Sequence, residues 1–103
     1  MNIQKMMKQM QKAQEQMATV QAQLADKTVE ATSGGGMVRV VMGGDGSLRS
    51  LTIDREVVDP DDVEMLQDLV VAAVNEGKRR ASELASAEMQ KAAGAMGLPP
   101  GLI

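Results

Sequence analysis

The sequence predicts an α+β domain in which a three-stranded antiparallel meander lies between two long helices. Residues 2–27 and most of 59–93 are rich in helix-forming residues. Between them, residues 28–53 hold six of the ten glycines, interleaved with Val, Thr and Leu. A chain of 103 residues has room for one domain. We therefore expect a single domain over 1–103 with the element order α-β-β-β-α.

The first predicted helix carries a heptad seam. Its apolar residues recur at alternating steps of three and four: Ile3, Met6, Met10, Ala13, Met17, Val20 and Leu24. Asn2 is a suitable N-cap. A helix over 2–27 would be roughly 39 Å long, at about 1.5 Å per residue. Because a compact chain of this size has a radius of gyration of only about 13 Å, we expect the helix to project beyond a small body.

The glycine-rich segment predicts three short strands, Thr28–Ser33, Met37–Met42 and Leu48–Asp54, joined by glycine turns. Alternation places Val38, Val40 and Met42 on one face of the second strand, and Leu51 and Ile53 on a face with Arg49. Three strands bury little on their own, so one face needs a covering layer.

The last helix is predicted over 60–93, with Asp59 as N-cap and Pro60 in the first helical position. Its first half is apolar nearly all round, which is typical of a segment buried on several sides. Its second half is predicted to form another projecting arm, and Gly77 between the halves allows a close backbone approach or a bend. Residues 94–103, rich in Gly and Pro, are expected to form a flexible tail.

A monomer with this organisation would expose the heptad seam to water. The economical solution is a two-fold homodimer. The residues assigned to the dimer interface or core are Met10, Met17, Val20, Leu66 and Val70.

The composition excludes most enzyme classes. The chain has no Cys and no His, so common nucleophiles, general bases and metal ligands are missing. It has no aromatic residue on which an unpaired base could stack. We expect no catalytic residue, no metal site and no cofactor. Nothing resembles a signal peptide or a transmembrane helix, so a cytosolic, soluble protein is expected.

The net charge of −3 is an average over segregated regions. Residues 1–14 carry +3 and residues 54–68 carry −6. The spacing of Lys5, Lys8 and Lys12 places them on one helix face, and the last helix carries Lys78, Arg79, Arg80 and Lys91. These cations suit either a surface that binds DNA phosphates or the solvated flank of a coiled coil. On charge alone, the coiled-coil flank is the favoured interpretation. A basic helix on a membrane is the weakest interpretation, since the first helix lacks Trp, Phe and Arg.

Four motifs together resemble the YbaB/EbfC family of small bacterial nucleoid-associated proteins. They are SGGGMV at 33–38, DPDDVEMLQDL at 59–69, VAAVN at 71–75 and GLPPG at 97–101. The similarity covers almost the full length, and its specificity lies in the combination.

The resemblance implies a tweezer-like homodimer whose helical arms grip double-stranded DNA without catalysis, in the cytoplasmic nucleoid. It implies that basic residues of the first and last helices contact DNA: Lys5, Lys8, Lys12, Lys78, Arg79, Arg80 and Lys91. Family genes often neighbour those of a recombination mediator and a clamp-loader subunit, so DNA repair and replication proteins are candidate partners. The alternative function is a coiled-coil adaptor that binds proteins in recombination or repair.

Overall fold

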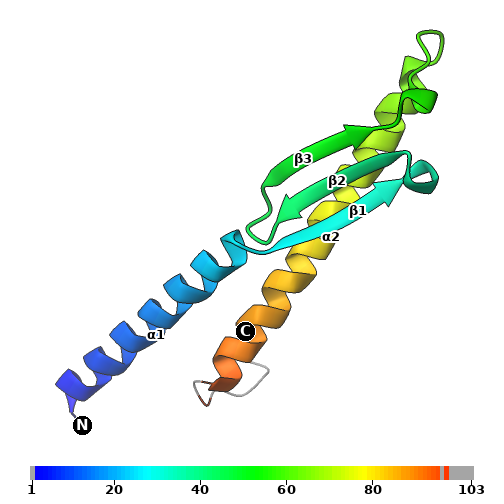
Figure 1. Ribbon diagram of the computed structural model, residues 1–103. Helices are drawn as coiled ribbons and strands as arrows, with labels where there is room; N and C mark the ends of the chain where they lie inside the picture. The colour runs from blue at the N-terminus through cyan, green and yellow to red at the C-terminus, as the bar shows by residue number, and fades with distance from the viewer. Residues whose placement is uncertain (1, 96, 98–103) are drawn as a thin grey trace.

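A computed structural model describes residues 2–95 and 97 and confirms the α-β-β-β-α order (Figure 1). The elements are α1 (Ile3–Ala25), β1 (Thr28–Ser33), a 3₁₀ turn η1 (Gly34–Gly36), β2 (Val38–Gly43), β3 (Leu48–Ile53), a 3₁₀ turn η2 (Arg55–Val57) and α2 (Val63–Ala95). Since α2 runs to Ala95, the predicted tail begins inside the helix; residues 96 and 98–103 of that tail lie outside the described residues.

The three strands form an antiparallel sheet in the order β1-β2-β3. Val38, Val40 and Met42 of the central strand are buried, which confirms the predicted face. The turn η1 between β1 and β2 needs its glycines, because all three have positive φ angles that a side chain would disfavour.

Helix α2 lies across one face of the sheet on a stripe of small residues. Ala73, Gly77 and Ala81 follow one another at intervals of four and are buried. A Cβ built on Gly77 would lie 2.6 Å from Cγ of Met42. The glycine therefore serves a close approach between helix and sheet, and α2 continues through it without interruption.

The Val-rich first half of α2 is less buried than the sequence predicts. Val63, Met65 and Val71 are exposed, while Leu66 and Val70 are half-buried, Val70 against the core cluster. The reason is that α2 packs mainly on β1 and β2, so only one side of the helix is covered within the described part of the chain.

The prediction that Asp59 caps the last helix is wrong. The helix begins at Val63, and the Asp62 carboxylate accepts the N–H of Met65 at 3.1 Å. The Asp59 carboxylate instead accepts the N–H of Asp61 at 2.9 Å, which closes a turn before the helix. Pro60 belongs to that turn.

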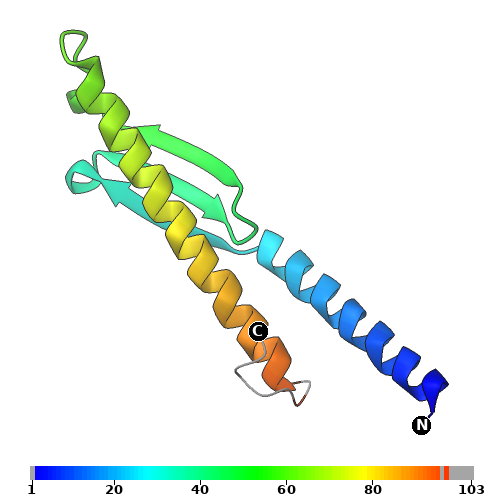
Figure 2. The ribbon, with the colours of Figure 1, turned by 180° about the vertical axis from the view of Figure 1, so that it is seen from behind.

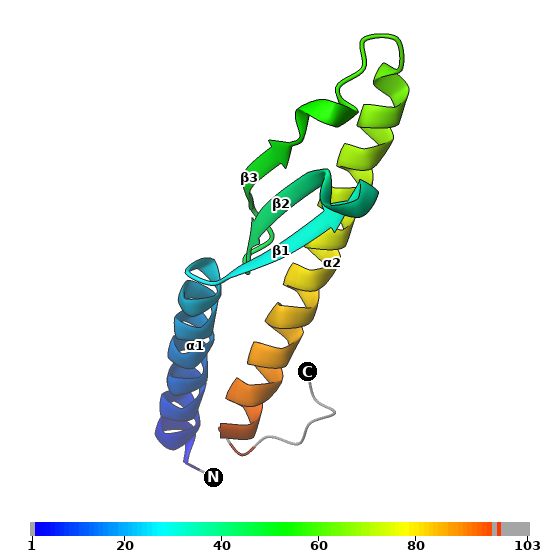
Figure 3. The same cartoon turned by 45° about the vertical axis from the view of Figure 1, so that its right-hand side comes forward.

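Helix α1 and the end of α2 leave the sheet in the same direction and run side by side with opposite chain direction (Figures 2 and 3). The molecule is therefore elongated, 71 Å along its main axis, and α1 projects as predicted. Val20 shares a shallow hollow with Ala92 and Ala95 of α2. The second half of the heptad seam thus packs within the chain, with Met17 half-buried and Leu24 buried.

The turn between β2 and β3 anchors the C-terminal end of α1. The N–H of Gly44 donates to the carbonyl of Lys27 at 2.8 Å, and the Arg49 guanidinium donates to the carbonyl of Ala25 at 2.7 Å. A Cβ on Gly44 would collide with the carbonyl oxygen of Leu24, so the contact requires glycine. Within residues 2–95, neither helix has the length and apolar character needed to cross a bilayer.

Candidate nucleic-acid interface

The first half of α1 carries a stripe of three lysines. Lys5, Lys8 and Lys12 are exposed on one surface of the helix, as their spacing predicts. In the described part of the chain none of them forms an ion pair, and the one acid on the same surface is Glu15. Asn2 holds the start of the helix, because its side chain accepts the N–H of Lys5 at 3.2 Å. We call Lys5, Lys8 and Lys12 the lysine stripe.

The consecutive cations of α2 do not form a second stripe. Each residue turns the helix by about 100°, so Lys78, Arg79 and Arg80 point in three directions. Gly77 and Ala81 face the sheet, which places Arg79 on the solvent side and the other two cations on opposite flanks. The sequence grouped these three as one basic surface, and the structure separates them.

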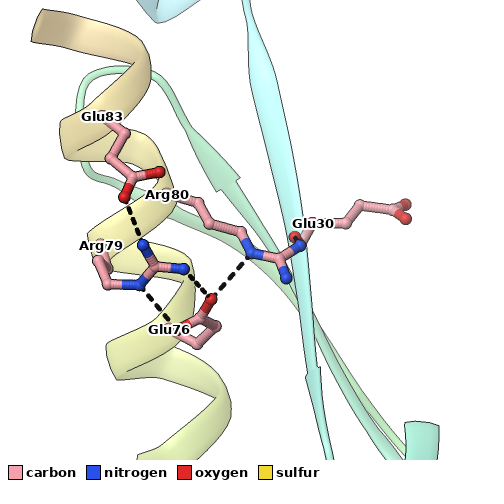
Figure 4. A network of polar contacts seen from close by, with 5 residues as sticks. All are labelled: Glu30, Glu76, Arg79, Arg80 and Glu83. Atoms are coloured by element: carbon pink, nitrogen blue, oxygen red, sulfur yellow. Dashed lines mark hydrogen bonds and ion pairs between the residues drawn. The ribbon is translucent and has the colours of Figure 1, made fainter.

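Two of the three are also neutralised by acids of the same helix (Figure 4). The Arg79 guanidinium donates to the Glu76 carboxylate at 3.0 and 2.5 Å and forms a further ion pair with Glu83. Arg80 donates to Glu76 at 3.0 Å and to the carbonyl of Glu30 on β1 at 2.8 Å. Hydrogen bonds from Arg79, and then from Arg80, lower the pKa of Glu76 to about 2, so it stays ionised at neutral pH.

The other two predicted cations of α2 are exposed and form no ion pair with a described residue. Lys78 and Asp45, which lies on the β2–β3 turn, line the same shallow hollow. Lys91 lies near the far end of the helix, one turn from Glu88. The Glu88 carboxylate is already paired with Lys27 at 2.7 Å, and that hydrogen bond lowers its pKa. Lys78 and Lys91 therefore remain available to an anionic ligand.

Sequence reasoning missed two further exposed cations, Arg39 and Arg55. Arg39 lies on the sheet face opposite the core, in register with Thr32 of β1 and Thr52 of β3. The alternation of Val38, Arg39 and Val40 carried this signal, because neighbouring strand residues point to opposite faces. Arg55 lies in η2, and neither residue is ion-paired among the residues that the structure describes.

Exposed apolar side chains gather in two regions. The first is the free end of α1, where Met10 is 62% exposed; its members are Ile3, Met6, Met7 and Met10. The second includes β3 and the start of α2; its members are Leu48, Leu51, Val58, Val63, Met65 and Val71. Where exposed apolar side chains form a contiguous patch, they indicate a contact with another macromolecule.

The β3 region is apolar because it belongs to the core face of the sheet. Leu51 pairs with Val40 across the strands, and Leu48 pairs with Met42 after a bulge in the register. Paired residues share a face, so both leucines lie on the side that α2 covers further along. Since α2 packs mainly on β1 and β2, Leu51 remains 41% exposed beside the open edge of β3.

The acidic segment 54–68 lies at the other end of the molecule from the lysine stripe (Figure 1). Several of them hold turns and helix starts: Asp54, Asp59 and Asp62 each accept a backbone N–H. No three acidic side chains among residues 2–95 and 97 converge on a point that could hold a metal ion.

Comparison with known proteins identifies relatives over nearly the whole chain. Residues 1–96 match the model of the YbaB/EbfC DNA-binding family. A nucleoid-associated protein of Acetivibrio thermocellus is 54% identical over 101 residues, which cover 98% of this chain and 89% of that protein. A nucleoid-associated protein of Syntrophobacter fumaroxidans is 53% identical over 100 residues, covering 93% and 91%.

A crystal structure of an uncharacterized protein from Helicobacter pylori has the same fold. Its TM-score is 0.73 at 26% identity, and the match covers 81% of this chain and 87% of that one.

Proposed function

The chain belongs to the YbaB/EbfC DNA-binding family, and on this basis we propose that it binds the backbone of double-stranded DNA through the lysine stripe of α1. The observation that carries the proposal is the arrangement of Lys5, Lys8 and Lys12 on one surface of a projecting helix, without ion pairs to described acids. Lysines in such a row suit the regular spacing of phosphate charges. Lys91 and Lys78 are secondary contacts.

The binding is non-catalytic and concerns the backbone rather than the bases. The chain has no aromatic residue to stack on an unpaired base, so duplex DNA is favoured over single strands. Phosphate contacts carry no direct sequence information, so the preference among duplex sequences is broad. Such binding places the protein in the cytoplasmic nucleoid, where it serves nucleoid organisation, gene regulation or DNA protection.

The protein acts as a two-fold dimer formed through β3. The strand has an open edge, and Leu48 and Leu51 extend the core face beyond the cover of α2. A second copy that pairs its own β3 region there would bury both leucines in a self-complementary contact. Because α1 projects away from the sheet, the dimer presents two arms, which gives the tweezer shape.

Salt dependence tests the DNA proposal. If all three lysines of both protomers contact phosphates, the slope of log K against log salt concentration is about −5, since each contact contributes about −0.9. Binding of labelled duplex DNA that does not respond to salt would refute the mechanism. A competition with single-stranded DNA measures the duplex preference in the same assay.

A matched pair of variants locates the contact. The double variant Lys8→Gln and Lys12→Gln removes two charges per protomer from the lysine stripe, and we expect it to weaken binding to all duplexes alike. Arg39→Gln with Arg55→Gln removes the same charge from exposed cations elsewhere. If the control pair weakens binding as much as the stripe pair, the stripe is not the interface.

The dimer has its own test. Sedimentation at micromolar concentration should give twice the chain mass of 10.9 kDa, and Leu51→Glu should shift the species to the monomer. A compact 10.9 kDa wild-type species would refute the dimer.

The exposed apolar end of α1 supports a second candidate function, a coiled-coil adaptor that binds recombination, repair or replication proteins. Met6 and Met10 lie at seam positions that the described part of α2 does not cover. For an adaptor, Met6→Gln with Met10→Gln abolishes partner binding while Lys8→Gln with Lys12→Gln leaves it intact. For the DNA-binding function we expect Lys8→Gln with Lys12→Gln to weaken duplex binding more than Met6→Gln with Met10→Gln.

A further inference from the structure

Glu76 lies between two of the cations that sequence reasoning assigned to DNA. Its carboxylate accepts hydrogen bonds from Arg79 and Arg80, while Arg79 also pairs with Glu83 (Figure 4). Two glutamates of α2 thus neutralise two neighbouring arginines of the same helix. The lysine stripe, by contrast, has no such balance from any described acid.

We infer that Glu76 limits the affinity of the protein for DNA by occupying the guanidinium groups of Arg79 and Arg80, so that a phosphate must displace its carboxylate to reach them. The inference rests on the proposed function, because it presupposes that the protein binds the phosphate backbone of DNA and adds Arg79 and Arg80 as contacts that Glu76 restricts. Glu76 is thereby an affinity-determining residue that touches the cations and not the DNA.

The geometry makes the carboxylate a direct competitor of phosphate. Both ligands offer oxygen atoms to the same N–H donors of a guanidinium. Glu76 uses Nε and Nη2 of Arg79 and Nε of Arg80, and its neighbour Glu83 takes Nη1 of Arg79. The side chains of Arg79 and Arg80 are 56% and 50% exposed, so a phosphate can approach both.

The exposure of these pairs also means that the competition is modest and reversible. Solvent-exposed ion pairs contribute little individually, and salt screens them further. Arg80 additionally donates to the carbonyl of Glu30, which keeps its guanidinium beside β1 when Glu76 is lost. Arg79 has no such second anchor among the described residues apart from Glu83, so it becomes the more mobile of the two.

The test variant is Glu76→Gln, which keeps the size and one acceptor oxygen but removes the charge. We expect duplex affinity to rise about twofold to fivefold at moderate salt, the range that corresponds to releasing one exposed ion pair. The salt dependence should steepen by up to about 0.9 for each additional phosphate that the arginines bind. Glu83→Gln, which releases only Arg79, should give a smaller rise.

Two controls separate this effect from a change of net charge. Glu64→Gln removes the same charge from an exposed position in the first turn of α2 and should leave affinity nearly unchanged. In a background with Arg79→Gln and Arg80→Gln, adding Glu76→Gln should have no further effect. Circular dichroism checks that each variant is folded. If Glu76→Gln does not fold, Glu83→Gln replaces it as the test variant. In that case, equal DNA affinity of Glu83→Gln and Glu64→Gln overturns the inference.

The possible failures are distinguishable. If wild-type protein binds duplex DNA in a salt-dependent way but Glu76→Gln matches Glu64→Gln, the inference alone is overturned. A rise that persists without Arg79 and Arg80 overturns it as well. A wild-type protein that binds no duplex at low salt overturns the proposed function, and the inference falls with it.

Discussion

The contact between α2 and the sheet at Gly77 predicts that adding a single methyl group there destabilises the protein. A Cβ at this position would lie 2.6 Å from Cγ of Met42 and 3.0 Å from Cγ2 of Val40. Both neighbours are buried in the central strand, and the Cγ of Met42 is not the free end of its side chain. The helix or the strand must therefore move when Gly77 becomes Ala.

The magnitude follows from two opposing effects. Overpacking a core costs about 1–3 kcal/mol. Replacing glycine by alanine inside a helix stabilises it by up to about 1 kcal/mol. We expect Gly77→Ala to lower the free energy of unfolding by about 1 kcal/mol, which corresponds to a fall in Tm of roughly 4–8 °C for a domain of this size.

The matched control is Gly94→Ala in the same helix. No atom of another described element lies within 4 Å of a Cβ built on Gly94, so only the improved helix propensity remains, reduced by its place near the helix end. Urea unfolding followed by far-UV circular dichroism suits a chain without aromatic residues, with all variants at one protein concentration. A Gly77→Ala variant as stable as the wild type or more stable would refute the close-contact argument.

Three further predictions concern the ends of the helices and the acid range. Asp62→Ala should lower the free energy of unfolding by about 1 kcal/mol because it removes the N-cap of α2, and Asp59→Ala should cost less; urea unfolding ranks them. Lys27 lowers the pKa of Glu88 below its ordinary value of 4.5, so the pair stabilises the protein above that pH and its contribution is lost as the pH falls through the lowered pKa. Glu88→Gln should therefore flatten the fall of Tm below about pH 4.5, and an unchanged acid profile would contradict the pairing. Arg49→Ala removes the donor to the last turn of α1 and should speed amide hydrogen exchange in that turn relative to the middle of the same helix.

The fold could be predicted from the sequence because its periods are clear and local. The first strand begins and ends at the predicted residues, Thr28 and Ser33, and the glycine turns fall between the strands as expected. The start of α2 was harder, because Asp59 and Asp62 are both good caps and only one can serve. Asp62 is left as the cap because the Asp59 carboxylate accepts the N–H of Asp61, and that contact depends on the three-dimensional turn.

The position of the core was predicted less well, for a physical reason. Hydrophobicity pointed to the Val-rich first half of α2, yet the buried residues of the helix are Ala73, Gly77, Ala81 and Ala93. Close packing of a helix on a sheet selects for small side chains, which carry little hydrophobic signal. The larger residues Val63 and Val71 are left exposed because no described element of the chain covers them.

Part of the arrangement of the cations could be predicted from the sequence. Steps of three and four predicted the lysine stripe, and helical geometry alone shows that three consecutive cations cannot share a face. The acids that neutralise Arg79 also stand at helical spacing, Glu76 three residues before it and Glu83 four residues after it. The bond from Arg80 to the carbonyl of Glu30 could not be predicted, because it joins residues fifty positions apart.

The elongated shape separates the acidic segment from the lysine stripe, which the proposed contact between that stripe and DNA requires. The acidic segment 54–68 and the lysine stripe lie toward opposite ends of a molecule 71 Å long (Figure 1). At physiological salt the Debye length is only about 8 Å, so a phosphate near Lys8 is screened from the distant acids. At about 10 mM salt the Debye length reaches about 30 Å, and the acids begin to oppose binding. The slope of log K against log salt should therefore flatten toward low salt.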